Sequence, residues 1–450
     1  MTRPCCIKAA GNNVHEKTFR IVTLGCKVNQ YESAYIGDAL CNAGWIPARD
    51  TEKADAIIVN TCIVTHKASR QSRQAIRKAI RENQGGCVAA IGCYAQVFPD
   101  ELADIEGISL VAGNSVKGDI PALVEDVVLS GTKKIVLRKF DRKCPFDFMP
   151  VKGLPDRSRA FLKIQDGCEA FCSYCIVPFA RGPYRSLVPR DVLFMLRSLA
   201  DQGFREVVLT GIHIGKYGVD LQPPVRLTDL LKIIAKEDLP VRVRISSIEP
   251  NEIDPDLIDM MASERWLCRH FHIPLQSGDD RILRKMRRRY TVREFADVVA
   301  SVYTKIPFAA IGVDVISGFP GETDEAHMNT LSCLQDLPVS YCHIFPFSPR
   351  SGTAAFNLNG RVDSGIIKQR TVQLRSLAGK KRHRFYSRCL NMKFSTVVEG
   401  WHCREKGLMK GITDNYIPVI FSSGNKRPGS VLDVLLKHVK QDAAFGEIVP

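Results

Sequence analysis

The chain has 450 residues, 45% hydrophobic and 25% charged, which is ordinary globular composition with enough length for two or three domains. Its net charge of +15 favours a polyanionic partner such as RNA, although a generally basic surface without nucleic acid is the alternative. No stretch approaches the roughly 18 apolar residues of a membrane span, and the polar N-terminus lacks the apolar core of a secretory signal. We therefore expect a cytoplasmic protein without a membrane partner, whose 16 cysteines stay reduced and indicate metal where they cluster.

Residues 1–18 are expected to be a disordered leader, and residues 19–130 then alternate short apolar runs with helical patterns. Strands separated by helices imply a parallel sheet, so this region predicts a small α/β domain. The predicted strands are Phe19–Leu24, Ala56–Asn60, Cys87–Ile91 and Ile108–Ala112, and the predicted helices are Gln30–Ala43 and His66–Glu82.

Prolines, glycine and charged residues interrupt this pattern over 131–158, which predicts a linker. Over 159–363, six more strands alternate with helical patterns. This order predicts a parallel barrel, complete or partial, with its chemistry at the C-terminal ends of the strands. The predicted strands are Phe161–Ile164, Glu206–Leu209, Arg242–Ser246, Phe271–Pro274, Ile311–Ile316 and Cys342–Phe345, and the helices include Arg190–Asp201, Thr228–Lys236, Thr291–Tyr303 and Glu325–Leu337.

A long helical pattern over 364–390 carries eight Lys or Arg and no acidic residue. Residues 391–450 alternate strand-like runs with glycine turns, which predicts a small β-barrel. The runs are Ser395–Val398, Tyr416–Phe421 and Val431–Leu436. The expected fold class is therefore α/β: a parallel-sheet N-terminal domain, a partial (β/α)6 barrel and a small C-terminal β-barrel.

Three cysteines with the spacing C-x3-C-x2-C, namely Cys168, Cys172 and Cys175, directly follow the first predicted barrel strand. A structural zinc site normally closes with four protein ligands, and no fourth Cys or His lies nearby in the sequence. A four-iron, four-sulfur cluster held by three thiolates leaves one iron open. The spacing resembles the signature of the radical S-adenosylmethionine superfamily, with buried structural cysteines or zinc as the alternative.

That resemblance implies that S-adenosylmethionine binds the open iron and is cleaved to a 5′-deoxyadenosyl radical, while the barrel orients the cofactor. It also implies cofactor contacts near the ends of the strands, although an ordinary turn explains each of these segments equally well when taken alone. Thr210-Gly211-Ile212-His213 departs from the Gly-Gly-Glu run that is frequent at this place in the superfamily. The cofactor-binding residues so implied are Tyr174, Gly211, Ser246, Glu249, Asp314 and Gly318.

A second set of cysteines follows three strands of the N-terminal domain: Cys26, Cys62 and Cys93. The C-terminal ends of adjacent parallel strands share one edge, so these thiols can converge on a second cluster. Isolated buried cysteines are the alternative reading of their spacing.

Five segments resemble the methylthiotransferase family, and the resemblance runs from about residue 19 to the C-terminus. They are Thr23–Ser33, Asn60–Thr65, Gly92–Gln96, His272–Gly278 and Gly318–Thr323. The family implies two 4Fe-4S clusters: an auxiliary cluster on Cys26, Cys62 and Cys93, and a radical cluster on Cys168, Cys172 and Cys175. It also implies that residues 391–450, including Gly411–Tyr416, form a TRAM domain that binds RNA.

The resemblance implies a reaction in which one S-adenosylmethionine methylates a sulfur on the auxiliary cluster and a second generates the radical that activates C2 of an adenine. Gly25-Cys26-Lys27-Val28-Asn29-Gln30 resembles the bacterial threonylcarbamoyladenosine branch. The expected reaction therefore converts N6-threonylcarbamoyladenosine, 3′ of the anticodon in tRNA, to its 2-methylthio derivative. The alternatives are isopentenyladenosine in tRNA, an aspartate of a ribosomal protein, or a non-catalytic, metal-stabilised RNA-binding protein.

Two basic segments, Arg281–Arg293 and the helix over 364–390, are predicted to contact tRNA phosphates, with solvated helical faces as the alternative. The residues chosen are Arg287, Arg288, Lys381, Arg382 and Arg384. A reducing partner of the flavodoxin or ferredoxin type is expected as electron donor, and the chain is expected to be a monomer. The remaining cysteines, including Cys5 and Cys6, show no ligand spacing.

Overall fold

The structure is a computed structural model that describes residues 16–49, 52–141, 144–153, 157–422, 424, 426–440 and 443–449. The expected leader lies outside the described residues except for its last positions, and Cys5 and Cys6 lie outside them as well. Among the described residues, no helix has both the length and the apolar character needed to cross a bilayer.

The N-terminal part is a six-stranded parallel sheet in the order β2-β1-β3-β4-β5-β6. The central strands β3 and β4 are buried along their whole length, because helices cover both faces of the sheet. The strands are β1 (Thr18–Thr23), β2 (Ile46–Pro47), β3 (Ala56–Thr61), β4 (Cys87–Gly92), β5 (Leu110–Ala112) and β6 (Lys134–Val136). The helices are α1 (Lys27–Asn42), α2 (His66–Glu82), α3 (Cys93–Val97), α4 (Pro99–Ala103) and α5 (Ile120–Ser130), preceded by the 3-10 turn η1 (Asn114–Asp119).

All four strands predicted for this sheet are confirmed, and two short edge strands were not predicted. One of them, β6, lies inside the segment expected to be a linker, so the start of that segment belongs to the sheet. Its three residues are too few to show a period, and only their pairing with β5 makes them a strand.

Six parallel strands form the partial barrel, as two three-stranded sheets in the orders β11-β10-β7 and β12-β13-β14. A parallel bridge between Val243 and Leu267 continues β11 toward β12, so the six strands follow one another in chain order. The strands are β7 (Ala160–Lys163), β10 (Glu206–Thr210), β11 (Arg242–Ile245), β12 (His270–His272), β13 (Ala310–Ser317) and β14 (Tyr341–Pro346).

Helices pack on the outer face of these strands around the largest apolar core, which includes Leu162, Leu209, Val243 and Val313. The helices are α7 (Pro189–Asp201), α8 (Leu227–Ala235), α9 (Pro255–Ser263), α10 (Asp280–Lys285), α11 (Val292–Lys305) and α12 (Asp324–Asp336). Short elements lie in the loops: β8 (Gln165–Asp166), α6 (Val177–Arg181), β9 (Arg185–Ser186), η2 (Ile214–Lys216), η3 (Pro250–Glu252) and η4 (Ala354–Asn357). Because side chains alternate along a strand, the neighbours of the core residues face the barrel interior.

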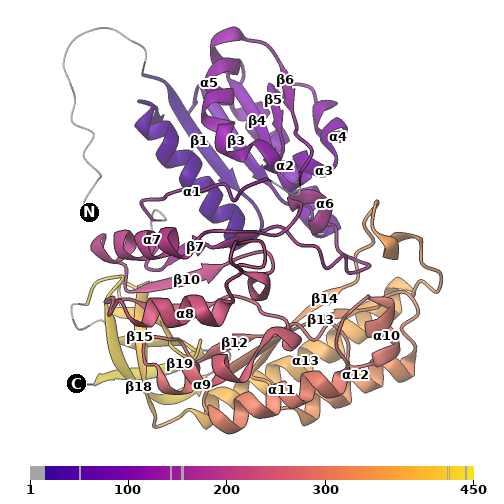
Figure 1. Ribbon diagram of the computed structural model, residues 1–450, viewed down its shortest axis with the longest axis vertical. Coiled ribbons are helices and arrows are strands. Elements are labelled where there is room, and N and C mark those ends of the chain that lie inside the picture. The colour runs from indigo at the N-terminus through magenta and orange to yellow at the C-terminus, as the bar shows by residue number, and fades with distance from the viewer. Residues whose placement is uncertain are drawn as a thin grey trace.

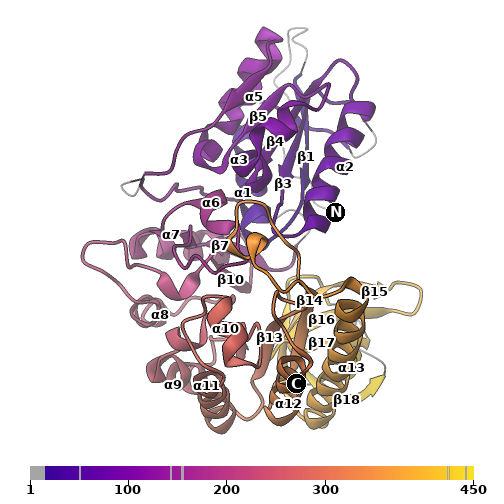
Figure 2. The same ribbon diagram turned by 90° about the vertical axis from the view of Figure 1, so that its right-hand side faces the viewer.

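The C-terminal part consists of α13 (Ser364–Arg388) and a closed five-stranded barrel in the order β15-β16-β17-β19-β18. Its strands are β15 (Lys393–Cys403), β16 (Leu408–Thr413), β17 (Pro418–Ser422), β18 (Val431–Lys440) and β19 (Ala443–Val449), of which β16 and β19 were not predicted. Figures 1 and 2 show the N-terminal sheet above β7 and β10 and the closed barrel, in yellow, at the other end of the molecule.

Candidate functional site

The loop that carries Cys168, Cys172 and Cys175 follows β8 and is held in place by its backbone. Gly167 has φ +76°, and a Cβ atom at this position would lie 1.7 Å from the carbonyl oxygen of Pro183, so only glycine fits. The amide of Cys168 donates to Gly182 O at 2.9 Å, and the amide of Cys175 donates to Cys172 O at 2.9 Å. The three thiols are half-buried and free, so the loop presents three unpaired sulfur atoms near one another.

Cationic groups surround these sulfur atoms. Nη1 of Arg288 donates to Cys172 Sγ at 3.3 Å, while its Nη2 pairs with Glu249. Nδ1 of His213 lies 3.4 Å from Cys168 Sγ, and its Nε2 lies 2.9 Å from a carboxylate oxygen of Glu252. Although burial opposes protonation, the hydrogen bonds with Cys168 and Glu252 raise the pKa of His213 to about 9. The surroundings therefore favour sulfur atoms that carry negative charge.

Two buried hydroxyl groups near the same end of the barrel have no hydrogen-bond partner among the described residues. They are the Oγ atoms of Ser246, directly after β11, and of Ser317, the last residue of β13. Buried hydroxyls are nearly always hydrogen-bonded, so two orphaned ones on neighbouring strands fit a polar ligand that completes them.

The other residues predicted to bind cofactor have contacts that the structure makes explicit. Tyr174 packs against an apolar cluster that contains Met286 and Phe319. A Cβ atom on Gly211 would lie 2.9 Å from Gln165 Oε1, and one on Gly318 would lie 2.3 Å from a side-chain carbon of Ile367. The close approach that requires glycine at 318 is therefore made by helix α13.

The second set of cysteines lies at one edge of the N-terminal sheet, where its adjacent strands β1, β3 and β4 end. Cys26 is the N-cap of α1, Cys62 follows β3, and Cys93 is the first residue of α3. A Cβ atom on Gly25 would be 2.9 Å from Cys62 Sγ, so the loop of Cys26 lies directly on Cys62. Burial raises the pKa of Cys62 to about 11, and the neighbouring thiols of Cys93 and Cys26 add to this increase. The expected convergence of these three thiols is thus present in the geometry.

A buried ionic network joins the two cysteine sets. The carboxylate of Glu32, on α1, accepts hydrogen bonds from Lys117, Lys163 and Arg181. Although burial opposes ionisation, Arg181, Lys117 and Lys163 hold the pKa of Glu32 well below its usual range. Arg181 also lies 3.3 Å from Asp166, two residues before Cys168, and 2.6 Å from Asn29, three residues after Cys26. Sequence analysis missed this network.

Models of two protein families match the chain: the Uncharacterized protein family UPF0004 over residues 18–113, and the Radical SAM superfamily over residues 162–334. A threonylcarbamoyladenosine tRNA methylthiotransferase of Bacillus subtilis is 36% identical over 424 residues, which cover 92% of each chain. The chain belongs to the radical S-adenosylmethionine tRNA methylthiotransferase family. A tRNA-2-methylthio-N(6)-dimethylallyladenosine synthase of Porphyromonas gingivalis is 32% identical and covers 98% of this chain and 96% of its own length.

A solved structure shares the fold of this methylthiotransferase family member at low sequence identity. It is the radical S-adenosylmethionine methyltransferase TsrM of Kitasatospora setae with cobalamin and a [4Fe-4S] cluster bound. The TM-score is 0.55 at 16% identity, and the match covers 76% of this chain and 77% of that one. The likeness confirms the radical S-adenosylmethionine fold that the strand order predicted.

Two of the five residues predicted to contact RNA are not available at the surface of this family member. Only 5% of the Arg288 side chain is exposed, because it lies between Cys172 and Glu249. The amine of Lys381 is turned inward and donates to the carbonyl oxygens of Gln335 and Leu337 at 2.7 and 2.6 Å. These two assignments are corrected: the positive charge of both residues serves buried partners. Arg287 and Arg384 are exposed, and Arg382 is half-buried.

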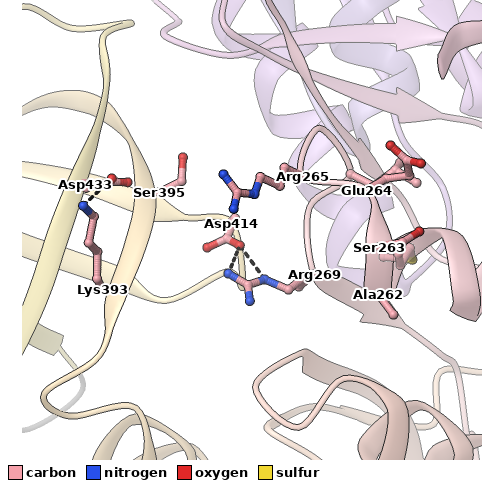
Figure 3. Close-up of a pocket in the computed structure, with 11 residues that line it drawn as sticks. Ala262, Ser263, Glu264, Arg265, Arg269, Lys393, Ser395, Asp414 and Asp433 are labelled. Atoms are coloured by element: carbon pink, nitrogen blue, oxygen red, sulfur yellow. Dashed lines mark hydrogen bonds and ion pairs between the residues drawn. The ribbon is translucent and has the colours of Figure 1, made fainter. Parts of the chain in front are cut away.

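A separate pocket lies between the barrel and the C-terminal strands (Figure 3). Arg269 and Asp414 meet across it with an N···O distance of 2.8 Å, and Lys393 pairs with Asp433 on its far wall. None of the cysteines discussed above lines this pocket, so it belongs to the contact between the two barrels.

Proposed function

We propose that this protein is a tRNA methylthiotransferase that converts N6-threonylcarbamoyladenosine, 3′ of the anticodon, to its 2-methylthio derivative. The observation that carries the proposal is the pair of free three-cysteine sets, joined by the buried Glu32–Arg181 network. Five of the relatives found are named threonylcarbamoyladenosine tRNA methylthiotransferases, and they reach 37% identity, which supports this branch over the others.

We assign the radical 4Fe-4S cluster to Cys168, Cys172 and Cys175 and a second, auxiliary cluster to Cys26, Cys62 and Cys93. Three thiolates at each site leave one iron of a cluster without a protein ligand. The guanidinium of Arg288 beside Cys172, and that of Arg181 within electrostatic range of Cys26 and Cys93, fit the negative charge of such clusters. With S-adenosylmethionine bound, the radical cluster supplies one-electron chemistry at adenine C2, a position with no proton acidic enough for an ordinary base.

The S-adenosylmethionine site is proposed to lie beside the radical loop, with Ser246 and Glu249 as polar contacts and Tyr174, Gly211 and Gly318 shaping its walls. Arg288 holds Glu249 in place, and the unpartnered hydroxyl of Ser246 awaits an acceptor or donor. Asp314 is held by two histidines on the interior of the barrel, and its role is taken up below.

The partners and the location follow from the same proposal. The substrate is tRNA, the closed C-terminal barrel is proposed as a TRAM-type RNA-binding domain, and Arg287, Arg382 and Arg384 are the proposed phosphate contacts. A flavodoxin-like or ferredoxin-like donor supplies electrons to a monomeric, cytoplasmic enzyme.

The deciding experiment is mass spectrometry of tRNA nucleosides from cells that lack the gene. We expect 2-methylthio-threonylcarbamoyladenosine to disappear and its unmodified precursor to accumulate. Wild type and a Cys403→Ala control should restore it, whereas Cys168→Ala and Cys26→Ala should not. Loss of the isopentenyl analogue instead would move the enzyme to that branch, and persistence of both nucleosides would exclude tRNA methylthiolation.

Metal analysis of anaerobically purified protein tests the clusters separately. Two clusters predict about eight irons per chain, and substitution of one cysteine in either set should leave about four. Stoichiometric zinc without iron would contradict the assignment and favour a metal-stabilised binding protein.

A further inference from the structure

Three side chains from neighbouring strands gather on the interior face of the barrel: His272 of β12, Asp314 of β13 and His343 of β14. Nε2 of His272 lies 3.0 Å from Asp314 Oδ1, and Nδ1 of His343 lies 3.2 Å from the same oxygen. In the strand register, Asp314 is directly opposite His343, and His272 is opposite Gly312. Two imidazole rings therefore flank one carboxylate on the face opposite the apolar core.

Their exposure increases from His272 to His343. The side chains of His272 and Asp314 are 10% and 25% exposed, and that of His343 is 53% exposed. The Nε2 atom of His343 has no hydrogen-bond partner among the described residues. The outermost ring thus offers one polar nitrogen to whatever enters the barrel.

The inner part of the group is fixed in orientation by a hydrogen-bonded chain. The hydroxyl of Tyr341 lies 3.2 Å from Nδ1 of His272 and 2.8 Å from Nε2 of His270. The ring of His270 stacks on Tyr416 of the C-terminal barrel, with 4.3 Å between the ring centroids. These contacts define the ring position of His272, and His272 in turn holds the carboxylate that aligns His343.

Lys27 extends a cationic group toward the same interior from the N-terminal domain. It is the first residue of α1, directly after Cys26, and lies within electrostatic range of Asp314, Arg159 and Arg244. Arg159 and Arg244 are paired with Glu206, whereas Lys27 has neither an ion pair nor a hydrogen bond among the described residues. An unpaired cation at the positive end of a helix, near two arginines, is unfavourable unless an anion joins it.

We propose that Lys27 and His343, the latter aligned by Asp314 and His272, form the subsite that binds the carboxylate of the threonylcarbamoyl group. This inference rests on the proposed function and names the residues that select its substrate. The ammonium of Lys27 and the Nε2–H of His343 supply charge-assisted hydrogen bonds to that carboxylate. An isopentenyl group carries no charge and would leave Lys27 buried against an apolar chain, so the same residues reject it. Asp314 and His272 are positioning residues.

The test compares binding of anticodon stem-loops that carry threonylcarbamoyladenosine or unmodified adenosine at the same position, using wild-type holoenzyme and the variants Lys27→Met and His343→Phe. We expect each variant to weaken binding of the modified stem-loop at least about tenfold and to leave the unmodified one unchanged. Lys27→Arg should restore part of the preference, and Lys236→Met on the exposed end of α8 is the matched charge control.

Each other outcome overturns the inference in an identifiable way. Equal weakening of both stem-loops would make Lys27 an RNA-phosphate contact, and loss of iron in Lys27→Met would tie it to the auxiliary cluster. A stoichiometric divalent metal that is lost in His343→Phe would make the group a metal site, which its mutual ligand distances of at most 4.8 Å also allow. If wild type modifies threonylcarbamoyladenosine and the variants keep their preference, only this inference fails. If wild type does not modify it, the proposed function fails.

Discussion

The guanidinium of Arg181 donates to the carboxylate of Glu32 at 2.5 Å, although 149 positions separate the two residues along the chain. Glu32 belongs to the N-terminal domain, and Arg181 follows the radical cysteine loop on α6. Both side chains are 1% exposed, so the contact is made without water. It sets the position of one cysteine-bearing loop relative to the other.

Glu32→Ala should destabilise the protein by about 3–5 kcal/mol, because it leaves Arg181, Lys117 and Lys163 buried without their common counter-ion. Glu32→Gln keeps the shape and should cost less. The free energy of unfolding in urea measures both. The matched control is Glu52→Ala, an exposed carboxylate paired only with Arg49, which should change stability by at most about 0.5 kcal/mol. A Glu32→Ala protein as stable as the control would contradict the role of the network.

Stability should fall in acid because buried carboxylates carry ion pairs. Although burial opposes ionisation, Arg244, Arg242 and Arg159 hold the pKa of Glu206 far below its usual range. A carboxylate with a depressed pKa in the folded state stabilises the protein above its unfolded pKa of about 4.3, and this stability is lost as the pH falls further. Urea midpoints of wild type and Glu206→Gln between pH 3 and 7 test this.

The two proteins should converge as the pH decreases, since protonation removes the charge that the substitution removes. Loss of iron in acid affects both proteins equally, so their difference isolates the carboxylate. A difference that is constant with pH would show that the charge of Glu206 contributes nothing.

Gly167→Ala should disturb the radical loop and leave the fold intact. The added Cβ atom would overlap the carbonyl oxygen of Pro183, which is backbone and cannot rotate away. We expect anaerobic protein to lose about half of its iron and to keep the circular dichroism of wild type. Gly379→Ala is the control, because nothing lies within 4 Å of a Cβ at this helical position. Full iron content in the Gly167→Ala protein would show that the loop adapts.

The buried and exposed cations should separate in RNA binding. Arg287→Ala, which removes an exposed charge, should lower the slope of log affinity against log salt by about one. Lys381→Met should leave the slope unchanged and reduce stability by about 1–3 kcal/mol, because two buried carbonyl oxygens lose their donor. Fluorescence titration with tRNA at several salt concentrations measures the slopes, and a lower slope for Lys381→Met would reverse this correction.

Most of the fold was predictable because its signals are local. The predicted helix over 66–82 agrees with α2 residue for residue, and each of the six predicted barrel strands overlaps an observed one. Short edge strands such as β2 and β6 escaped prediction, since two or three residues show no period and pairing alone defines them.

The sequence by itself determined the order of strands and helices, the three-cysteine spacing within one loop and the placement of three further cysteines after strands. These depend on periodicity and on neighbours in the chain. Only the tertiary structure decided which cations are buried, as with Arg288 and Lys381, and which distant groups meet, as with Glu32 and Arg181 or with His272, Asp314 and His343. The physical reason is that a charge in a sequence looks the same whether it faces water or a buried carboxylate. The packing of one domain against another assigns its partner.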